Sequence, residues 1–373
     1  MQTRLKLLHD WNHQLHQLLP DVRSTRVDVL ALLTLGVLWS GSVTLLKVAA
    51  CLPLSATDMS TERRFRRWLA NRSVPVTAIC RPLVSTMLAS RAGTELVLAL
   101  DPTPQGAHKT VIVLGLVAHK RVLPLLWHLL PSQARWAQSQ HTYLSRLCRV
   151  VAGWLPQGCT VTLVADRGLV SRELVLLCRS LGWHYVLRLS TDAKQGYRVR
   201  HLDGREQPLW ELVTGPGQRW YGSVELFKRG GWVQVELTLY WERGYDEPWI
   251  LISDRPAGLA RVRQYRKRWC AEPTYQDCKR RGWDLEASRI TADNRLNRLL
   301  LVLFIVLWWA QALGARVVRR GLRTRFDRRD RRELSLVRLG RRWVAELLCH
   351  TRPHPLLFRY HTHNASWSYT WLF

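Results

Sequence analysis

Glu95 to Pro102 reads E-L-V-L-A-L-D-P, and this stretch decides the class of fold. Its continuous apolar run has the length of a strand buried inside a sheet. We expect that strand to stop at Asp101-Pro102. A second run of the same kind, Cys159 to Ala165 (C-T-V-T-L-V-A), ends in Asp166-Arg167-Gly168. Two buried strands that each end in an aspartate predict an α/β core.

The segments around these runs alternate between strand and helix patterns. A short turn at His119-Lys120 separates two of the strands. The expected strands are Lys109 to Val117, Arg121 to Leu130 and Tyr185 to Leu189, and the expected helices are Ala134 to Trp154 and Ser171 to Leu181.

From Ser190 to Glu247 the pattern becomes all-β. Apolar residues at every second position from Val233 to Trp241 predict a strand, and Gly230-Gly231 just before it is a hairpin signal. We interpret this stretch as a β-rich insertion in the α/β core. A strand, Trp249 to Ser253, follows it, and helical patterns then continue to about Cys349.

The first 90 residues have helical patterns. They include a basic stretch, R-R-F-R-R-W-L, from Arg63 to Leu69. Arginines interleaved with Phe65 and Trp68 favour a helix that lies along a DNA backbone. The alternative is a solvated arginine face above two core aromatics.

The balance of charge points to a polyanionic partner. The chain has 373 residues with 56 basic and 28 acidic side chains, a formal charge of +28, and 48 of the cations are arginines. Nucleic acid is the usual partner of such a chain, and the planar guanidinium suits phosphates and base edges.

Two uncharged runs, Val29 to Leu46 and Leu299 to Ala315, could be membrane spans. Both are at or below the length that crosses about 30 Å of hydrocarbon. We therefore expect buried helices, no membrane association and a cytoplasmic protein.

Acidic residues form the candidate catalytic set. Asp101 and Asp166 follow strands whose carboxyl ends form the ligand-binding edge of an open sheet. Glu272 lies on a predicted helix with Tyr265, Arg268 and Lys279, and all four fall within an arc of roughly 60° if the helix is straight. Three carboxylates at one edge would suit Mg²⁺ or Mn²⁺. Two such ions support phosphodiester chemistry.

The string Y-R-K-R-W-C-A-E-P-T-Y-Q-D-C-K, Tyr265 to Lys279, resembles the Y-R-E-K signature of bacterial insertion-sequence transposases of the DDE class. The match extends to separate motifs over roughly residues 60 to 345. They are L-A-L-D-P-T around Asp101, P-L-L-W-H-L-L-P, V-A-D-R-G around Asp166, and R-G-W-D-L-E after the helix.

This resemblance implies an α/β fold with an RNase H-like catalytic core, an all-β insertion and a helical N-terminal domain. Asp101, Asp166 and Glu272 would be the catalytic, metal-binding triad for Mg²⁺ or Mn²⁺, with two ions. Tyr265, Arg268 and Lys279 would contact phosphates near the transposon end, and Trp249 would stack on a base flipped out of the duplex.

The implied organisation has five parts. They are a helical DNA-binding region (1–90), a first core part (91–190), the insertion (191–248), a second core part with the Y-R-E-K helix (249–345) and a tail (346–373). The implied partners are double-stranded DNA, as terminal inverted repeats and target, and a second copy of the chain in a DNA-bridged homodimer associated with the nucleoid.

Two residues fit this resemblance less well. Pro273 follows Glu272 and would kink the helix, whereas Asp277 is a rival carboxylate about 140° away from the shared stripe.

Three other functions stay open. The chain could be an RNase H-like nuclease or resolvase without strand transfer. It could also be an inactive DNA-binding descendant of a transposase, or an integral membrane protein. No phosphate-binding G-x-x-x-x-G-K-[S/T] loop occurs in the sequence.

Overall fold

The computed structural model describes residues 2–106, 108–132, 136–191 and 196–349. Within them the chain forms two compact units. The sheet unit contains residues 94–153 and 159–275, and the helical unit contains residues 1–93, 154–158 and 276 onward. The predicted tail lies outside the described residues from position 350. The five-part division by function stays a prediction.

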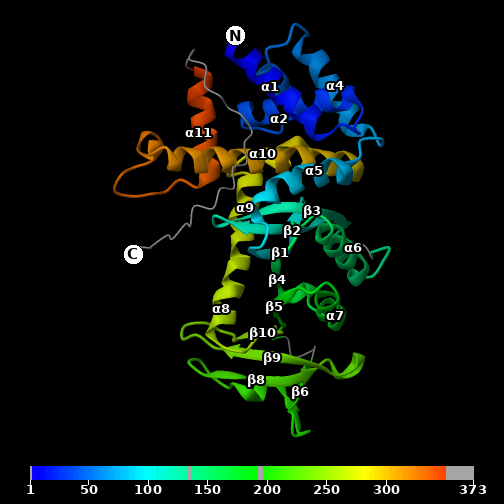
Figure 1. The fold of residues 1–373 in the computed structure, drawn as a ribbon, viewed down its shortest axis with the longest axis vertical. Helices are drawn as coiled ribbons and strands as arrows, with labels where there is room; N and C mark the ends of the chain where they lie inside the picture. The colour runs from blue at the N-terminus through cyan, green and yellow to red at the C-terminus, as the bar shows by residue number, and fades with distance from the viewer. Residues whose placement is uncertain (1, 107, 133–135, 192–195, 350–373) are drawn as a thin grey trace. The chain divides into compact units, whose positions relative to one another are not determined.

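The sheet unit is built on one ten-stranded sheet. Its first five strands run in the order β3-β2-β1-β4-β5. The strands β1, β2 and β3 are antiparallel neighbours, whereas β1, β4 and β5 are parallel. Of these five strands, only β2 runs opposite to the others. This order and direction are those of an RNase H-like core, so the predicted fold class is confirmed (Figure 1). The strands are β1 (Glu95–Gln105), β2 (Lys109–Ala118), β3 (Arg121–Pro131), β4 (Thr160–Ala165) and β5 (His184–Arg188).

The predicted insertion is β-rich and extends the same sheet. After β5 the order continues β10-β9-β8-β6-β7, and β10 pairs antiparallel with both β5 and β9. Because β10 returns the chain to the core edge, the helix that bears Glu272 starts close to the core strands. These strands are β6 (Arg198–Arg200), β7 (Glu206–Pro208), β8 (Arg219–Leu226), β9 (Val233–Tyr240) and β10 (Trp249–Ser253).

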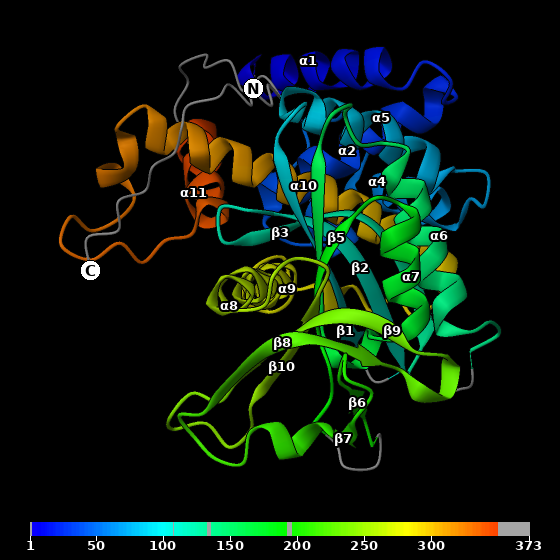
Figure 2. The ribbon, with the colours of Figure 1, turned by 60° about the horizontal axis from the view of Figure 1, so that its bottom comes forward.

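Helices cover both faces of the core strands. Figure 2 shows α6 (Gln140–Ala152) and α7 (Arg172–Ser180) on one face and α8 (Leu259–Arg266) on the other. The prediction for α6 was wrong at its start, because Ser139 caps the helix by accepting a hydrogen bond from the Thr142 N–H. The helix therefore begins six positions later than the apolar pattern suggested.

The helical unit is organised around α10 (Asp293–Arg319). Its Trp308 and Trp309 are almost fully buried, and the Trp309 ring lies 4.4 Å from that of Trp11. Among the described helices α10 is the one long and apolar enough to cross a membrane, but 78% of its apolar window is buried inside the protein. Such burial is typical of a core helix. The other helices of the unit are α1 (Gln2–Leu18), α2 (Ser24–Ser40), α3 (Leu45–Ala50), α4 (Asp58–Ala70), α5 (Val76–Leu88) and α11 (Leu336–Cys349).

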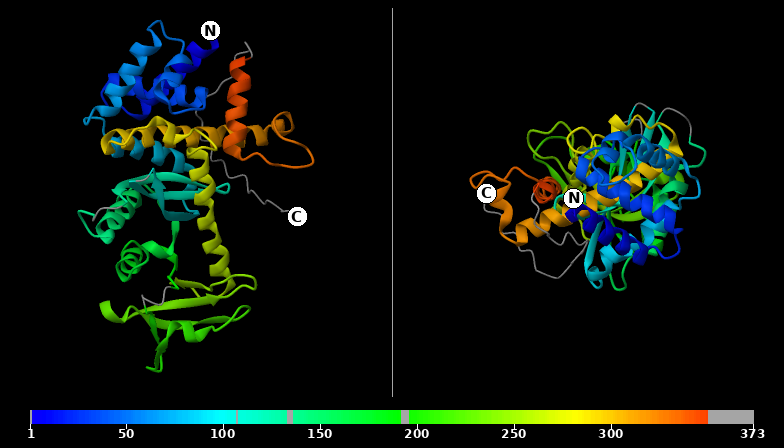
Figure 3. Two further views of the ribbon diagram at one scale, coloured as in Figure 1. Left: turned by 180° about the vertical axis from the view of Figure 1, so that it is seen from behind. Right: turned by 90° about the horizontal axis from the view of Figure 1, so that it is seen from above.

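Two glycines permit α11 to cross α10 closely (Figure 3). A Cβ atom at Gly314 would lie 1.8 Å from the Leu336 carbonyl oxygen, and one at Gly340 would lie 1.9 Å from that of Ala310. No side chain fits at either position, so the crossing requires glycine on both helices.

The aromatic residues of the basic stretch on α4 belong to the core. Phe65 is fully buried and Trp68 is 5% exposed, whereas Arg63, Arg64, Arg66 and Arg67 are exposed. Interleaving of arginine with aromatic residues here therefore reflects helical amphipathicity. The exposed arginine face remains available to a polyanion.

Candidate active site

Two parallel strands place the aspartates side by side. The last residue pair of β1 and β4 is Leu100 with Ala165, and Asp101 and Asp166 come next on each strand. Because neighbouring strands lie about 4.8 Å apart, the two carboxylates start from adjacent backbone positions. Sequence alone predicted this juxtaposition.

The predicted end of the first strand was wrong. β1 continues through Asp101 to Gln105, paired with β2 as a hairpin. Pro102 and Pro104 lie beyond the last β1–β4 pair, in a part of β1 that pairs with β2. A proline is tolerated there, because its missing N–H costs no hydrogen bond to β4. Asp101 is therefore held rigidly within a strand and is only 5% exposed.

The helix with the Y-R-E-K residues is not one straight α-helix, as the stripe calculation assumed. After α8 the chain forms a 3-10 helix, Lys267–Cys270, and then α9 (Ala271–Cys278). The 3-10 geometry has 3.0 residues per turn, so it changes the rotation between successive side chains. Pro273 lies in the first turn of α9, where a missing N–H is tolerated.

Arg268 lies between two of the predicted catalytic carboxylates. Its Nη1 donates to Asp101 Oδ1 at 2.6 Å, and its Nη2 is 3.5 Å from Glu272 Oε1. The Asp101 and Arg268 side chains are 7% and 9% exposed, whereas Glu272 is half exposed at 52%. One guanidinium thus spans a buried and an exposed carboxylate.

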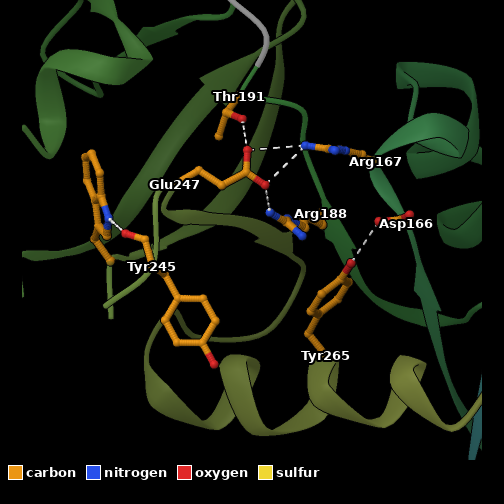
Figure 4. A network of polar contacts seen from close by, with 8 residues as sticks. Asp166, Arg167, Arg188, Thr191, Tyr245, Glu247 and Tyr265 are labelled. Atoms are coloured by element: carbon orange, nitrogen blue, oxygen red, sulfur yellow. Dashed lines mark hydrogen bonds and ion pairs between the residues drawn. The ribbon is translucent and has the colours of Figure 1, made fainter. Parts of the chain in front are cut away.

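Tyr265 completes the group. Its fully buried hydroxyl donates to Asp166 Oδ1 at 3.2 Å (Figure 4). Tyr265 and Arg268 therefore contact the carboxylates in this state. Their predicted contacts with DNA phosphates would require both side chains to leave these partners.

Burial and charge act together on these groups. Burial raises the pKa of Asp101, although the positive charge of Arg268 acts in the opposite direction. Burial also acts to lower the pKa of Arg268, but the neighbouring Tyr265, Asp101 and Asp166 outweigh it and raise that pKa. Arg268 therefore stays charged, as a cation held among acidic groups.

Thr274 and Tyr275 fix α9 against the strands, and no sequence pattern indicated either role. The buried Thr274 hydroxyl accepts from the Val122 N–H at 2.8 Å and donates to the Cys270 carbonyl at 3.0 Å. The Tyr275 hydroxyl donates to the Asp101 carbonyl at 3.2 Å. These bonds set the position of Glu272 relative to Asp101.

Glu247 is a second residue that sequence reasoning missed. Figure 4 shows its carboxylate between Arg167, which follows Asp166, and Arg188 of β5. The Arg167 Nη1 lies 3.2 Å from both oxygens and the Arg188 Nη2 lies 2.5 Å from one, while the Thr191 hydroxyl donates to the other. Glu247 thus joins the end of the insertion to the loop that bears Asp166.

Trp249 is half-buried beside the site. Its ring stacks on Trp269 at 6.5 Å and meets Tyr265 edge-on at 5.4 Å, while Arg188 and Arg266 lie about its ring. Trp269, which is 44% exposed, shields one side of it. Stacking of Trp249 on a flipped base stays a prediction. Lys279 belongs to the helical unit, and its phosphate contact also stays a prediction.

The carboxylates are not gathered as a ready metal site. Among the described residues, no group of three or more His, Cys, Asp or Glu side chains lies close enough to hold a metal ion. The positive charge that contacts Asp101 and Glu272 is the Arg268 guanidinium. The donor set nevertheless fits Mg²⁺ or Mn²⁺, because these ions prefer carboxylate oxygens and the buried Asp101 already has a cationic partner.

Part of the chain matches a known protein family. Residues 139–309, which include Asp166 and Glu272, match the family described as "Transposase DDE domain". A solved structure, the "Cryo-EM structure of piggyBac transposase synaptic complex with hairpin DNA", is similar with a TM-score of 0.42 and 12% identity, over 95% of this chain and 81% of that chain. A likeness this distant adds no argument of its own, and no curated protein matches the chain. Residues 139–309 are therefore assigned to a DDE transposase domain, a class of domain that uses divalent metal ions to cleave DNA and transfer the cut strand.

Proposed function

We propose that Asp101, Asp166 and Glu272 hold the metal ions of this transposase, two Mg²⁺ or Mn²⁺ ions in the working enzyme. When bound, such ions polarise the phosphodiester and activate the attacking hydroxyl. The single observation behind this proposal is that the Arg268 guanidinium already bridges Asp101 and Glu272. Both side chains already pair with one positive charge, at the point where the proposal places a metal ion.

Arg268 would then have two positions. In the described state it compensates the charge of Asp101, which is buried. When the carboxylates hold a metal ion, Arg268 would leave Asp101 and Glu272, and its guanidinium would suit a phosphate oxygen of bound DNA. Tyr265 and Lys279 would contact further phosphates, and Trp249 would stack on an extruded base.

The substrates in this proposal are the terminal inverted repeats of a bacterial insertion sequence and a target duplex. The first step is hydrolysis of a phosphodiester at the element end, which frees a 3′-hydroxyl. That hydroxyl attacks a second phosphodiester, so one ester bond forms as another breaks and no external energy source is needed. Two copies of the chain would bridge the two ends, and the reaction would take place on the nucleoid in the cytoplasm.

Substitution of the carboxylates tests the proposal. Asp101→Asn, Asp166→Asn and Glu272→Gln should each lower the rate of Mg²⁺-dependent cleavage at the element end by more than about a thousandfold, because several kcal/mol of charge stabilisation is lost. Binding of the same duplex should remain measurable. Glu242→Gln, which removes a partly exposed carboxylate paired with Arg266 on the same unit, is the matched control.

Cleavage at the wild-type rate by any of the three variants would remove that residue from the proposed set. An equally large loss of cleavage in Glu242→Gln would show that the assay responds to the charge of the protein rather than to these three carboxylates.

A further inference from the structure

A basic cavity lies in the helical unit, and its lining includes none of the carboxylates discussed above. It has a volume of about 410 Å³ and lies between α3, α4, the 3-10 helix Leu285–Ser288 with its following residues, and the start of α10. Its walls include the cations Lys47, Arg66, Arg289 and Arg295 and a single carboxylate, Glu62. Four positive charges against one negative charge make this cavity a site for an anion.

Three of these cations are available to a ligand. Glu62, with a side chain only 12% exposed, pairs with Arg66 at 2.6 Å. Lys47, Arg289 and Arg295 are exposed, and within the described residues none of their side chains forms an ion pair or hydrogen bond. An unpaired cluster of like charges is unfavourable by itself, and a bound polyanion would relieve the repulsion.

The R-G-W-D-L-E motif explains how Arg289 reaches the cavity. Trp283 in this motif is fully buried, and its carbonyl accepts from the Val43 N–H at 3.2 Å. Asp284 and Arg289 at the two ends of the following 3-10 helix have left-handed backbones, with φ of 53° and 51°. The motif thus anchors a tight turn beside α3 and presents Arg289 at the cavity wall.

The opposite wall is held by Arg298 of α10. Its buried side chain donates to the Leu69 carbonyl at the end of α4 at 2.9 Å and to the Asn294 carbonyl at 2.6 Å. These bonds fix α4 to the first turn of α10, which bears Arg295. The cavity is therefore a rigid arrangement of cations from four separate segments.

We propose that this cavity binds a backbone phosphate of duplex DNA. Exposed Arg63 lies one helical turn before Arg66, so the positive surface continues along α4 beyond the cavity. A surface that extends in this way suits a regularly charged backbone better than a small anion. The assignment of the ligand rests on the proposed function, since it takes DNA as the substrate.

Binding measurements on charge variants test this site. Arg289→Asn removes the charge and keeps a residue that tolerates the left-handed backbone, and Arg295→Gln removes a charge on α10. The probes are a 30-base-pair duplex with the element end and a scrambled duplex of the same length. Each variant should weaken both complexes by about tenfold and reduce the slope of log Kd against log salt by about 0.9, since a phosphate contact has no sequence information.

Arg319→Gln is the matched control. It removes an exposed arginine from the same helix about 36 Å from Arg295, at 1.5 Å per residue. The control should bind both duplexes as the wild type does, and Arg289→Lys should recover most of the lost affinity. All variants should cleave at the wild-type rate when DNA is saturating.

Unchanged affinity and salt slope in Arg289→Asn and Arg295→Gln, or an equal loss in Arg319→Gln, would overturn the phosphate site. Failure of the wild type to cleave the element end, with binding intact, would instead contradict the proposed catalytic function. The binding measurements test the phosphate site whether or not the wild type cleaves the element end.

Discussion

Arg268 is the residue on which the described state of the site depends most. It neutralises Asp101 inside the protein and reaches Glu272 at the surface. Removal of one partner from a buried ion pair leaves an uncompensated charge, which costs about 3–5 kcal/mol. The same residue thus stabilises the described state and, in the proposed function, contacts a phosphate once metal and DNA are bound.

Arg268→Ala should therefore lower the free energy of unfolding by about 3–5 kcal/mol in the absence of metal. The double variant Asp101→Asn/Arg268→Ala should lose less than the sum of the single variants, because no buried charge remains. Urea denaturation of the four proteins measures this coupling. Additive losses would show that the two side chains do not stabilise each other.

Glu247 predicts a pH dependence of stability. Burial acts to raise its pKa, but the hydrogen bond from Thr191 and the charges of Arg188 and Arg167 outweigh it, so the pKa is lowered from its ordinary value of 4.5. A lowered pKa in the folded state gives stability that is full above the ordinary pKa and is lost as pH falls through the folded one.

The difference in unfolding free energy between wild type and Glu247→Gln should accordingly be constant near neutral pH and shrink below about pH 4.5. Its size should be at most about 1 kcal/mol, because the carboxylate is 38% exposed and screened by solvent. Denaturation series at several pH values measure it. A difference that grows on acidification would contradict the lowered pKa.

Single residues could be predicted where they belong to a pattern. Asp101 and Asp166 were singled out because each follows a buried apolar run, and Glu272 because it shares a motif with Tyr265 and Arg268; their catalytic role stays a prediction. Thr274 and Glu247 could not be found, because their partners lie 152 and 80 positions away in the sequence. Nothing local distinguishes a threonine that accepts a distant backbone N–H from one in solvent.

At the scale of elements, the junction of α8, the 3-10 helix and α9 positions the site. Thr274 is the link between this junction and the sheet, through the buried N–H of Val122. The 3-10 helix turns Arg268 toward Asp101, and α9 then places Glu272 at the surface. Displacement of α9 would separate Glu272 from the strand carboxylates.

Thr274→Val should lower the free energy of unfolding by about 1–3 kcal/mol, because it leaves a buried N–H without an acceptor at nearly constant volume. Cleavage should fall as well, since Glu272 loses its support. Thr274→Ser is the matched control and should keep both properties near wild type. Equal behaviour of the two variants would show that the hydroxyl has no positioning role.

Elements were predicted well where periodicity and turn signals agreed. The strand Trp249–Ser253 was predicted with its observed bounds, and the hairpin at His119-Lys120 is present with both residues at positive φ. Errors arose where tertiary contacts decide. β1 continues past its prolines because β2 pairs with it, and the Y-R-E-K stretch is broken because Arg268 and Tyr265 turn toward the aspartates.

At the scale of the whole molecule, the charge of +28 and the apolar helix α10 led to opposing hypotheses about the partner. A DNA-binding protein and a membrane protein differ in what releases them from a cell extract. The burial of α10 among the other helices of its unit supports the former.

Extraction separates the two. The protein should leave DNA-cellulose when salt is raised and should need no detergent, since 6–10 phosphate contacts would lose about 10³–10⁵ in affinity between 50 and 200 mM salt. Sedimentation with membranes after high salt, reversed only by detergent, would contradict this account.

Iron-mediated cleavage of the polypeptide tests the metal site most directly. Fe²⁺ can replace Mg²⁺ at carboxylate ligands, and in the presence of ascorbate and peroxide it cuts the nearby backbone. We predict cuts close to residues 101, 166 and 272, three positions far apart in the sequence, which Mg²⁺ suppresses and which Asp101→Asn abolishes. Cuts at other positions, or cuts at these positions that persist in Asp101→Asn, would show that the three carboxylates do not share a metal ion.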